Sequence, residues 1–180
     1  FNVLAGGTTT IGGVTMNVTG ATTIDGEIFF SSNTGVKIFV GLVTVNAGGI
    51  WGSTAITTVT NLVFRNGIIH NGNSFQAGAG TFNTNAQSIT GSTAMTFQNS
   101  IVVTTIVLTN NITVSMTNTG AVVLSGTGTW TQGLTGILNY SGSTITITTF
   151  NATASGNTIN YNSTTTAQTI RSTTYHHLIV

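Results

Sequence analysis

Charged side chains are almost absent from this sequence. Only 3% of its 180 residues are Asp, Glu, Lys or Arg, and the long stretch from 66 to 170 contains none. An ordinary globular domain has about 25%. The net charge is +1, and Lys37, Arg65 and Arg171 are scattered along the chain. Nucleic-acid binding needs clustered cations, so the sequence predicts no nucleic-acid partner.

Proline and cysteine are both missing. The absence of Cys excludes a disulfide scaffold and thiol chemistry. The absence of Pro fits a fold in which nearly every backbone N–H is used, because Pro would leave a gap in a continuous ladder. The densest apolar run, "IVVTTIVL" at 101–108, is much shorter than the roughly 18 residues of a membrane-spanning helix. We therefore expect no membrane insertion.

The chain is rich in Thr, Gly and Asn, and 39% of it is hydrophobic. That hydrophobic content is the opposite of the signature of disorder. Apolar and polar residues alternate in "GVTMNVTG" (13–20), "ITVSM" (112–116) and "STITITTF" (143–150). A period of two predicts half-buried strands, and Gly/Asn/Ser corners between them predict many short strands in an all-β chain.

An aromatic residue followed two positions later by a carboxamide recurs at equal steps along the chain, from Phe64 to Phe97 and from Phe97 to Trp130. Steps of this length, within the range of about 20 to 45 residues, are typical of stacked repeats. We interpret the carboxamides as a corner ladder and the aromatics as a stack inside, over one large coil or two smaller ones. The carboxamides are Asn33, Asn66, Asn99 and Gln132, and the aromatics are Phe64, Phe97 and Trp130.

A parallel β-solenoid explains this composition best. Equivalent residues stack about 4.8 Å apart, so like charges repel along a column whereas Asn and Thr bond to their own copies. We predict one solenoid segment over residues 1–180, an internal part of a longer chain. An antiparallel β-sandwich is the alternative, although it gives no reason to exclude charge.

The sequence offers few groups for catalysis or metal binding. Asp25 and Glu27 are the only carboxylate side chains, and we expect them to lie in a solvated turn. We interpret His70 as an exposed or capping residue, and His176 and His177 as facing opposite sides of a strand, where they cannot chelate one ion together. No enzyme, metal site or cofactor is predicted.

The C-terminal segment 156–180 resembles a repeat of very large surface adhesins from Bacteroidetes-type bacteria. The resemblance is carried by Asn160-Tyr161-Asn162, Ala167-Gln168-Thr169-Ile170, Thr174-Tyr175 and Leu178-Ile179-Val180. Many such proteins are exported by the type IX route, and some are similar to gliding adhesins. The resemblance implies a β-helical stalk at the cell surface, outside the cell.

The sequence thus leads to one main functional hypothesis and two alternatives. The main one is a structural and adhesive surface module, a rigid stalk or filament segment. Its partners would be neighbouring repeats or identical copies, surface glycans or abiotic surfaces. The first alternative is an ice- or crystal-binding solenoid, with Thr144/Thr146/Thr148 and Thr127/Thr129 as contact rows. The second is a polysaccharide-processing β-helix that uses Asp25 or Glu27.

Overall fold

The computed structural model describes residues 1–52, 61–117 and 122–180. Over these residues the chain forms 23 strands and no helix, so none of them belongs to an apolar helix that could cross a membrane. Each strand is short, from the two residues of β1 (Asn2–Val3) to the five of β13 (Gln87–Gly91). The prediction of an all-β chain is confirmed.

The strands assemble into three sheets. The eight-stranded sheet consists, in spatial order, of β1, β4 (Thr22–Ile24), β7 (Val43–Val45), β10 (Ile68–His70), β13, β16 (Val107–Asn110), β19 (Thr129–Gln132) and β21 (Thr149–Asn151). The nine-stranded sheet consists of β2 (Thr8–Ile11), β5 (Glu27–Phe30), β8 (Ile50–Trp51), β11 (Ser74–Ala77), β14 (Met95–Phe97), β17 (Thr113–Met116), β20 (Ile137–Tyr140), β22 (Thr158–Tyr161) and β23 (His177–Ile179). The six-stranded sheet consists of β3 (Met16–Val18), β6 (Lys37–Phe39), β9 (Leu62–Phe64), β12 (Gly80–Phe82), β15 (Ile101–Val103) and β18 (Leu124–Ser125).

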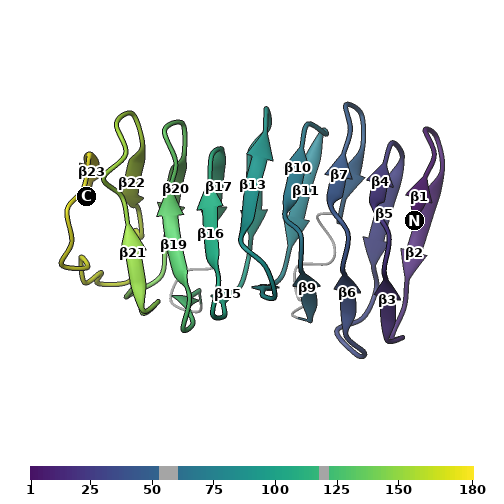
Figure 1. The fold of residues 1–180 in the computed structure, drawn as a ribbon, viewed down its shortest axis with the longest axis horizontal. Coiled ribbons are helices and arrows are strands. Elements are labelled where there is room, and N and C mark those ends of the chain that lie inside the picture. Colours follow the sequence, from purple (N-terminus) through teal and green to yellow (C-terminus); the bar gives the residue numbers. More distant parts are fainter. Residues whose placement is uncertain (53–60, 118–121) are drawn as a thin grey trace.

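The three sheets are the sides of a parallel β-solenoid. Every strand pair in the described residues is parallel, and each strand pairs with the strand three places along the chain over most of the length, as β4 does with β7. Figure 1 shows the coils standing side by side from the N-terminus to the C-terminus. The solenoid prediction is confirmed, and the antiparallel sandwich is excluded because its sheets would pair strands in opposite directions.

The coil is shorter and less regular than the predicted step from Phe64 to Phe97. Phe64 pairs with Phe82 in the next coil, well before Phe97 is reached. The step between paired residues also varies, since it is shorter from Leu62 to Gly80 than from Lys37 to Leu62. Because the loops differ in length from coil to coil, the sequence has no fixed repeat. The predicted period is therefore wrong as a coil length.

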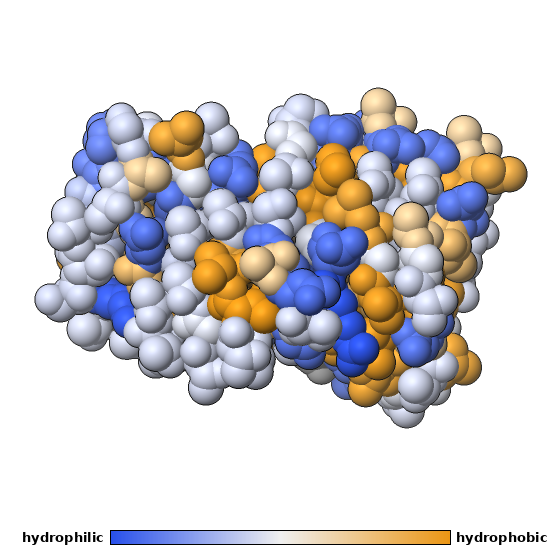
Figure 2. Space-filling view, viewed as in Figure 1, coloured by the Kyte–Doolittle hydropathy of each residue, from blue (hydrophilic) through white to orange (hydrophobic). Residues whose placement is uncertain are grey.

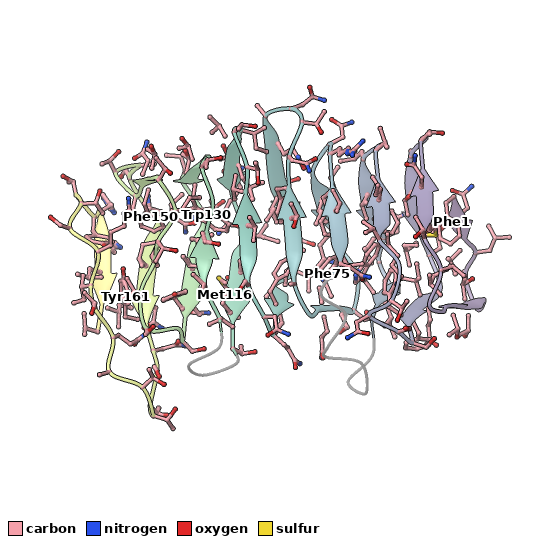
Figure 3. The ribbon with its side chains drawn as sticks, turned by 90° about the horizontal axis from the view of Figure 1, so that it is seen from below. Phe1, Phe75, Met116, Trp130, Phe150 and Tyr161 are labelled. Atoms are coloured by element: carbon pink, nitrogen blue, oxygen red, sulfur yellow. The ribbon has the colours of Figure 1, made fainter. Side chains whose placement is uncertain are left out.

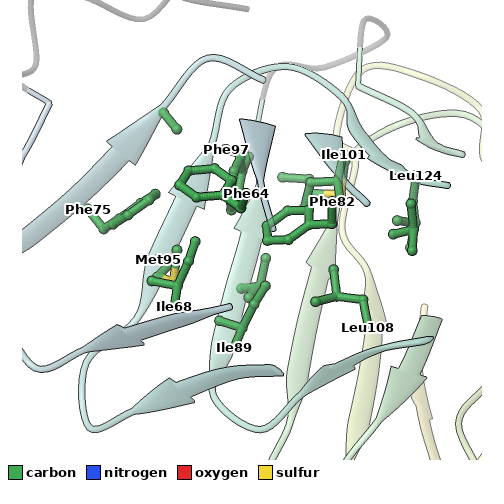
Figure 4. Close-up of a cluster of buried hydrophobic side chains, with 14 of the residues drawn as sticks. Phe64, Ile68, Phe75, Phe82, Ile89, Met95, Phe97, Ile101, Leu108 and Leu124 are labelled. Carbon is green, nitrogen blue, oxygen red and sulfur yellow. The ribbon is translucent and has the colours of Figure 1, made fainter. Parts of the chain in front are cut away.

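The predicted alternation between buried and outward residues is confirmed on all three sheets. In β4, β12 and β14, for example, which come one from each sheet, the first and third residues are buried and the middle one is partly exposed. The buried side chains form one hydrophobic cluster from Val3 to Tyr161. Figure 4 shows its centre, where Phe64, Phe82 and Phe97 meet aliphatic side chains.

Aromatic rings stack within this core along the direction of the coils. Phe39, Phe64 and Phe82 are in register on the six-stranded sheet, and their ring centroids are 5.7 and 5.2 Å apart. Trp51 and Phe75 form a second stacked pair, at 5.1 Å, on the nine-stranded sheet. Figure 3 shows other interior side chains, such as Trp130 and Phe150, at successive positions along the coils. Each ring thus fills the space above its neighbour, which favours offset or tilted aromatic pairs.

Residues 156–180 form the last complete coil of the described structure and the first strand of the next one. Thr169 pairs with Thr144, Tyr175 pairs with Ala152, and β22 pairs with β20, so this segment stacks in parallel on the coil before it, while β23 stacks on β22 within the segment. Gln168 donates from Nε2 to the carbonyls of Tyr140 and Gly142, both at 2.8 Å. The residues that carry the adhesin resemblance thus fix this coil to the preceding one.

Candidate functional site

The predicted column of carboxamides is wrong in its members. Asn66 follows β9 of the six-stranded sheet, whereas Asn99 follows β14 of the nine-stranded sheet. Asn33 lies exposed in the loop between β5 and β6. Asn66 therefore lies at a different corner from Asn33 and Asn99. Those two share the corner between the nine- and six-stranded sheets, but β8 and β11 stand between their coils in the nine-stranded sheet, so none of the three can bond to another as a stacked copy.

The predicted aromatic stack is also wrong in its members. Phe64, Phe97 and Trp130 are all fully buried, as expected for interior residues. However, they belong to the six-, nine- and eight-stranded sheets respectively. In the ladders Phe64 lies between Phe39 and Phe82, and Trp130 pairs with Phe150. The rings that stack come from successive coils of one sheet.

Carboxamide ladders do exist, at positions that the spacing did not indicate. On the outer face of the nine-stranded sheet, Asn160 donates from Nδ2 to Asn139 Oδ1 at 3.2 Å. Asn139 in turn donates to Ser115 Oγ at 3.1 Å. Inside the solenoid, Asn110 donates to Gln132 Oε1 at 3.1 Å, and that oxygen also accepts from Trp130 Nε1 at 2.7 Å. Gln132 is therefore a ladder residue, but its neighbour is Asn110 in the adjacent coil.

The two carboxylate side chains lie at one corner, near the N-terminal end. Asp25 and Glu27 line a cavity of about 260 Å³ together with Thr8 and several glycines. Asp25 Oδ1 accepts from Asn46 Nδ2 at 2.8 Å, and Glu27 Oε2 accepts from Thr8 Oγ1 at 3.2 Å. Each carboxylate thus accepts a hydrogen bond from a neutral side chain in a neighbouring coil. These two bonds link adjacent coils.

His70 is buried and not exposed. Its side chain ends β10 facing inward, its ring packs edge-on against Phe75, and its Nδ1 accepts the backbone N–H of Gly72 at 3.3 Å. His70 therefore caps the turn that follows β10, which is one of the two roles that the sequence suggested. Burial lowers the pKa of the imidazole to about 4, and an interaction with the Ala94 backbone opposes part of this shift. The ring is therefore neutral near pH 7.

His176 and His177 do not face opposite sides of a strand. Their ring centroids are 4.3 Å apart, because His176 lies before β23 begins and does not follow its alternation. His176 Nδ1 accepts from the Gly156 backbone N–H at 3.1 Å. Across residues 1–52, 61–117 and 122–180, no three His, Cys, Asp or Glu side chains gather as metal ligands would.

Lys37 is a polar core residue that sequence reasoning missed. It sits in an inward position of β6 and is fully buried. Its ammonium donates to the backbone carbonyls of Ser32 at 3.0 Å, Thr34 at 2.6 Å and Gly35 at 2.9 Å. Desolvation lowers the pKa of the amine. The ammonium closes the loop between β5 and β6. The sequence gave no signal that position 37 faces inward, because Val36, Ile38, Phe39 and Val40 around it are all apolar and do not alternate with polar residues.

The outer faces of the three sheets differ in chemistry. The central outward column of the six-stranded sheet mixes polar and apolar residues, namely Asn17, Ile38, Val63, Thr81, Val102 and Ser125. The nine-stranded sheet carries the Ser115–Asn139–Asn160 ladder, whose polar groups bond to each other. The C-terminal half of the eight-stranded sheet has outward Thr residues, described in detail below. Figure 2 shows a mostly pale, weakly polar surface over the C-terminal coils, while hydrophobic patches gather towards the middle and the N-terminal half.

The two predicted Thr rows do not share a face. Thr144, Thr146 and Thr148 alternate with the buried Ile145 and Ile147, but Thr144 stacks on Thr169 and not on another strand of the eight-stranded sheet. Thr129, by contrast, belongs to β19 in that sheet, and Thr127 lies in the turn before it.

In comparisons with known proteins, no family model, curated sequence or solved structure matches this chain.

Proposed function

We propose that this chain is a rigid structural and adhesive module of the cell surface, a stalk or filament segment of a large extracellular adhesin. The observation that supports this most is the continuity of the ladders: the nine-stranded sheet pairs each strand with the next from β2 to β23. Nine stacked strands span roughly 38 Å, and every added coil extends the rod by about 4.8 Å. A segment of this kind therefore acts as a rod whose length is set by its number of coils.

The chemistry of the described residues also supports a structural role. The two carboxylates, the buried Lys37 and His70 all bond to groups of the same or a neighbouring coil. Side chains of the types used for catalysis are therefore occupied in joining coils, as Asp25 and Glu27 are, or in holding a loop or turn of their own coil, as Lys37 and His70 are. The resemblance of residues 156–180 to adhesin repeats supports an extracellular location, and their stacking on the previous coil is what a repeat in a continuous stalk requires.

Adhesion by such a module would depend on many weak contacts. A near-neutral surface offers no strong electrostatic site, so affinity must come from repetition along the rod and from many copies on one cell. The terminal strands also have one unpaired edge in the described structure, and such edges pair readily with further parallel strands. Neighbouring repeats or identical copies are the partners that this geometry favours.

Immunogold electron microscopy of the source cells tests the proposal. Antibodies raised against the recombinant chain should label the outside of intact cells, on fibres or stalks that project from the surface. Brief protease treatment of intact cells should remove that label. Labelling confined to the cell interior, with no label on intact cells, contradicts the proposal.

A further inference from the structure

The outward Thr residues of the eight-stranded sheet form aligned columns. One column runs through Val107, Thr129 and Thr149 of β16, β19 and β21. A second runs through Ser88, Thr109, Thr131 and Asn151, beginning on β13. The two columns are separated by one inward residue along each strand. Their groups therefore form a grid of roughly 4.8 Å across the strands by about 6.6 Å along them.

The hydroxyl groups of this grid are available to a ligand. Among the described residues, the hydroxyls of Thr109, Thr129, Thr131 and Thr149 make no hydrogen bond within the protein, in contrast to the bonded Asn139 and Asn160 on the nine-stranded sheet. Thr is β-branched, so the strand backbone restricts the direction of each hydroxyl before any ligand arrives. The order of the grid is thus set by the fold, and binding costs little side-chain entropy.

The chemistry of the grid defines the ligand. We infer that this face, from β13 to β21, binds the ordered surface of an uncharged polysaccharide. None of its outward residues is charged, so the complementary surface is neutral. Thr hydroxyls both donate and accept, as sugar hydroxyls do. The methyl groups of Thr and the exposed Val107 match the C–H patches of sugar rings, whereas a water lattice such as ice has no C–H groups to offer.

This inference rests on the proposed adhesive role and names its ligand class. It assigns binding to the array of outward hydroxyls and not to exposed aromatic platforms, because Trp51, Trp130 and Tyr140 are fully buried in the core. A single soluble sugar would meet only one or two hydroxyls and bind weakly. A crystalline surface meets the whole grid at once, so its contacts add up within one encounter.

Depletion from solution by microcrystalline cellulose and by chitin particles tests the assignment. We expect the wild-type chain to be depleted by at least one of the two solids. Thr131→Lys, at the centre of the grid, should reduce binding at least tenfold by placing a long charged side chain against a flat neutral surface. The triple variant Thr109→Val, Thr129→Val, Thr131→Val keeps the β-branched shapes and removes three hydroxyls. It should weaken binding roughly tenfold or more, since each lost hydrogen bond accounts for about a 2- to 10-fold change.

The matched control is Thr96→Lys, an outward position on β14 of the nine-stranded sheet. It should bind like the wild type, and far-UV circular dichroism should show that all variants keep their strands. The inference is overturned if neither solid depletes the wild-type chain from solution. It is also overturned if Thr96→Lys and Thr131→Lys lose binding equally. Thermal hysteresis without polysaccharide binding also overturns it, in favour of an ice surface. The labelling experiment on cells can fail independently, which separates this inference from the proposed function.

Discussion

His70 gives this chain a pH dependence of stability that can be isolated unusually well. The imidazole is fully buried, and burial lowers its pKa to about 4 from the ordinary 6.5. Only two carboxylate side chains are present in the whole sequence. Ordinary proteins lose stability in acid through many carboxylates together. Here one histidine should dominate the response above pH 5.

The sign follows from the lowered pKa. An unfolded chain takes up the proton near pH 6.5, whereas the folded chain resists it until about pH 4. Stability is therefore fully present above pH 6.5 and is lost progressively as the pH falls towards 4. Between pH 8 and pH 5 the free energy of unfolding should decrease by about 2 kcal/mol, which lowers the melting temperature by roughly 4 to 8 °C for a chain of this size.

Thermal unfolding followed by circular dichroism at pH 8, 7, 6 and 5 measures this effect. In His70→Asn the side-chain oxygen can still accept the Gly72 N–H, but nothing titrates at this position. That variant should start from a lower melting temperature, because it loses the contact with Phe75, and should then vary little with pH. The control His176→Asn, His177→Asn, at exposed positions, should keep the wild-type slope. A flat wild-type profile, or a slope that survives in His70→Asn, refutes the reasoning.

Three further variants test the stacking itself, each by chemical denaturation. Phe64→Ala removes the middle ring of the Phe39–Phe64–Phe82 column and should cost about 3–5 kcal/mol, whereas a cost below about 1 kcal/mol would mean that the column is not packed as described. Asn139→Leu keeps the approximate size of the side chain but removes both its donor to Ser115 Oγ and its acceptor for Asn160 Nδ2, and should destabilise by about 1–3 kcal/mol, whereas no change would mean that this ladder does not stabilise the rod. Gly91→Ala should be strongly destabilising, because φ is +127° there and the added Cβ would overlap the His70 carbonyl oxygen; Ser92→Ala, next to it, is the control and should change stability little, since it loses only an exposed hydrogen bond to Asn71 Oδ1.

The local part of the fold could be predicted from sequence because it depends on neighbours along the chain. Alternation in "ITVSM" places Val114 and Met116 inward, and both are buried. Gly and Asn corners end the strands because each coil must turn sharply between sheets. Parallel stacking followed from a physical argument about charge, and the observed registers agree with it: Glu27 lies between Thr8 and Ile50, with no like charge above or below.

The long-range part could not be predicted, because the loops vary in length. The pattern of Phe64 with Asn66, and of Phe97 with Asn99, records an inward aromatic at the end of a strand followed by a polar corner. That local arrangement occurs on more than one sheet, so two copies at a regular distance along the chain need not stack. Only the pairing of whole strands sets the true register, as between Asn139 and Asn160. A lone sequence whose coils differ in length contains no simple period that reveals it.

The scarcity of charge connects the fold to the proposed function. In a ladder with a spacing of about 4.8 Å, a column of like charges would repel at every step, whereas hydroxyl and amide columns do not. The same rule that permits stacking therefore leaves the outer faces neutral and repetitive. Where the side chains bond to each other, as Ser115, Asn139 and Asn160 do, they stabilise the rod.

Where the outward side chains do not bond to each other, as on β16, β19 and β21, the same geometry presents ordered hydroxyls to the outside. Contacts made by such a face are insensitive to salt, since screening acts on charges. A neutral solenoid is thus suited to attachment in media of any ionic strength, and the proposed adhesion would scale with the number of coils in contact and not with any single residue.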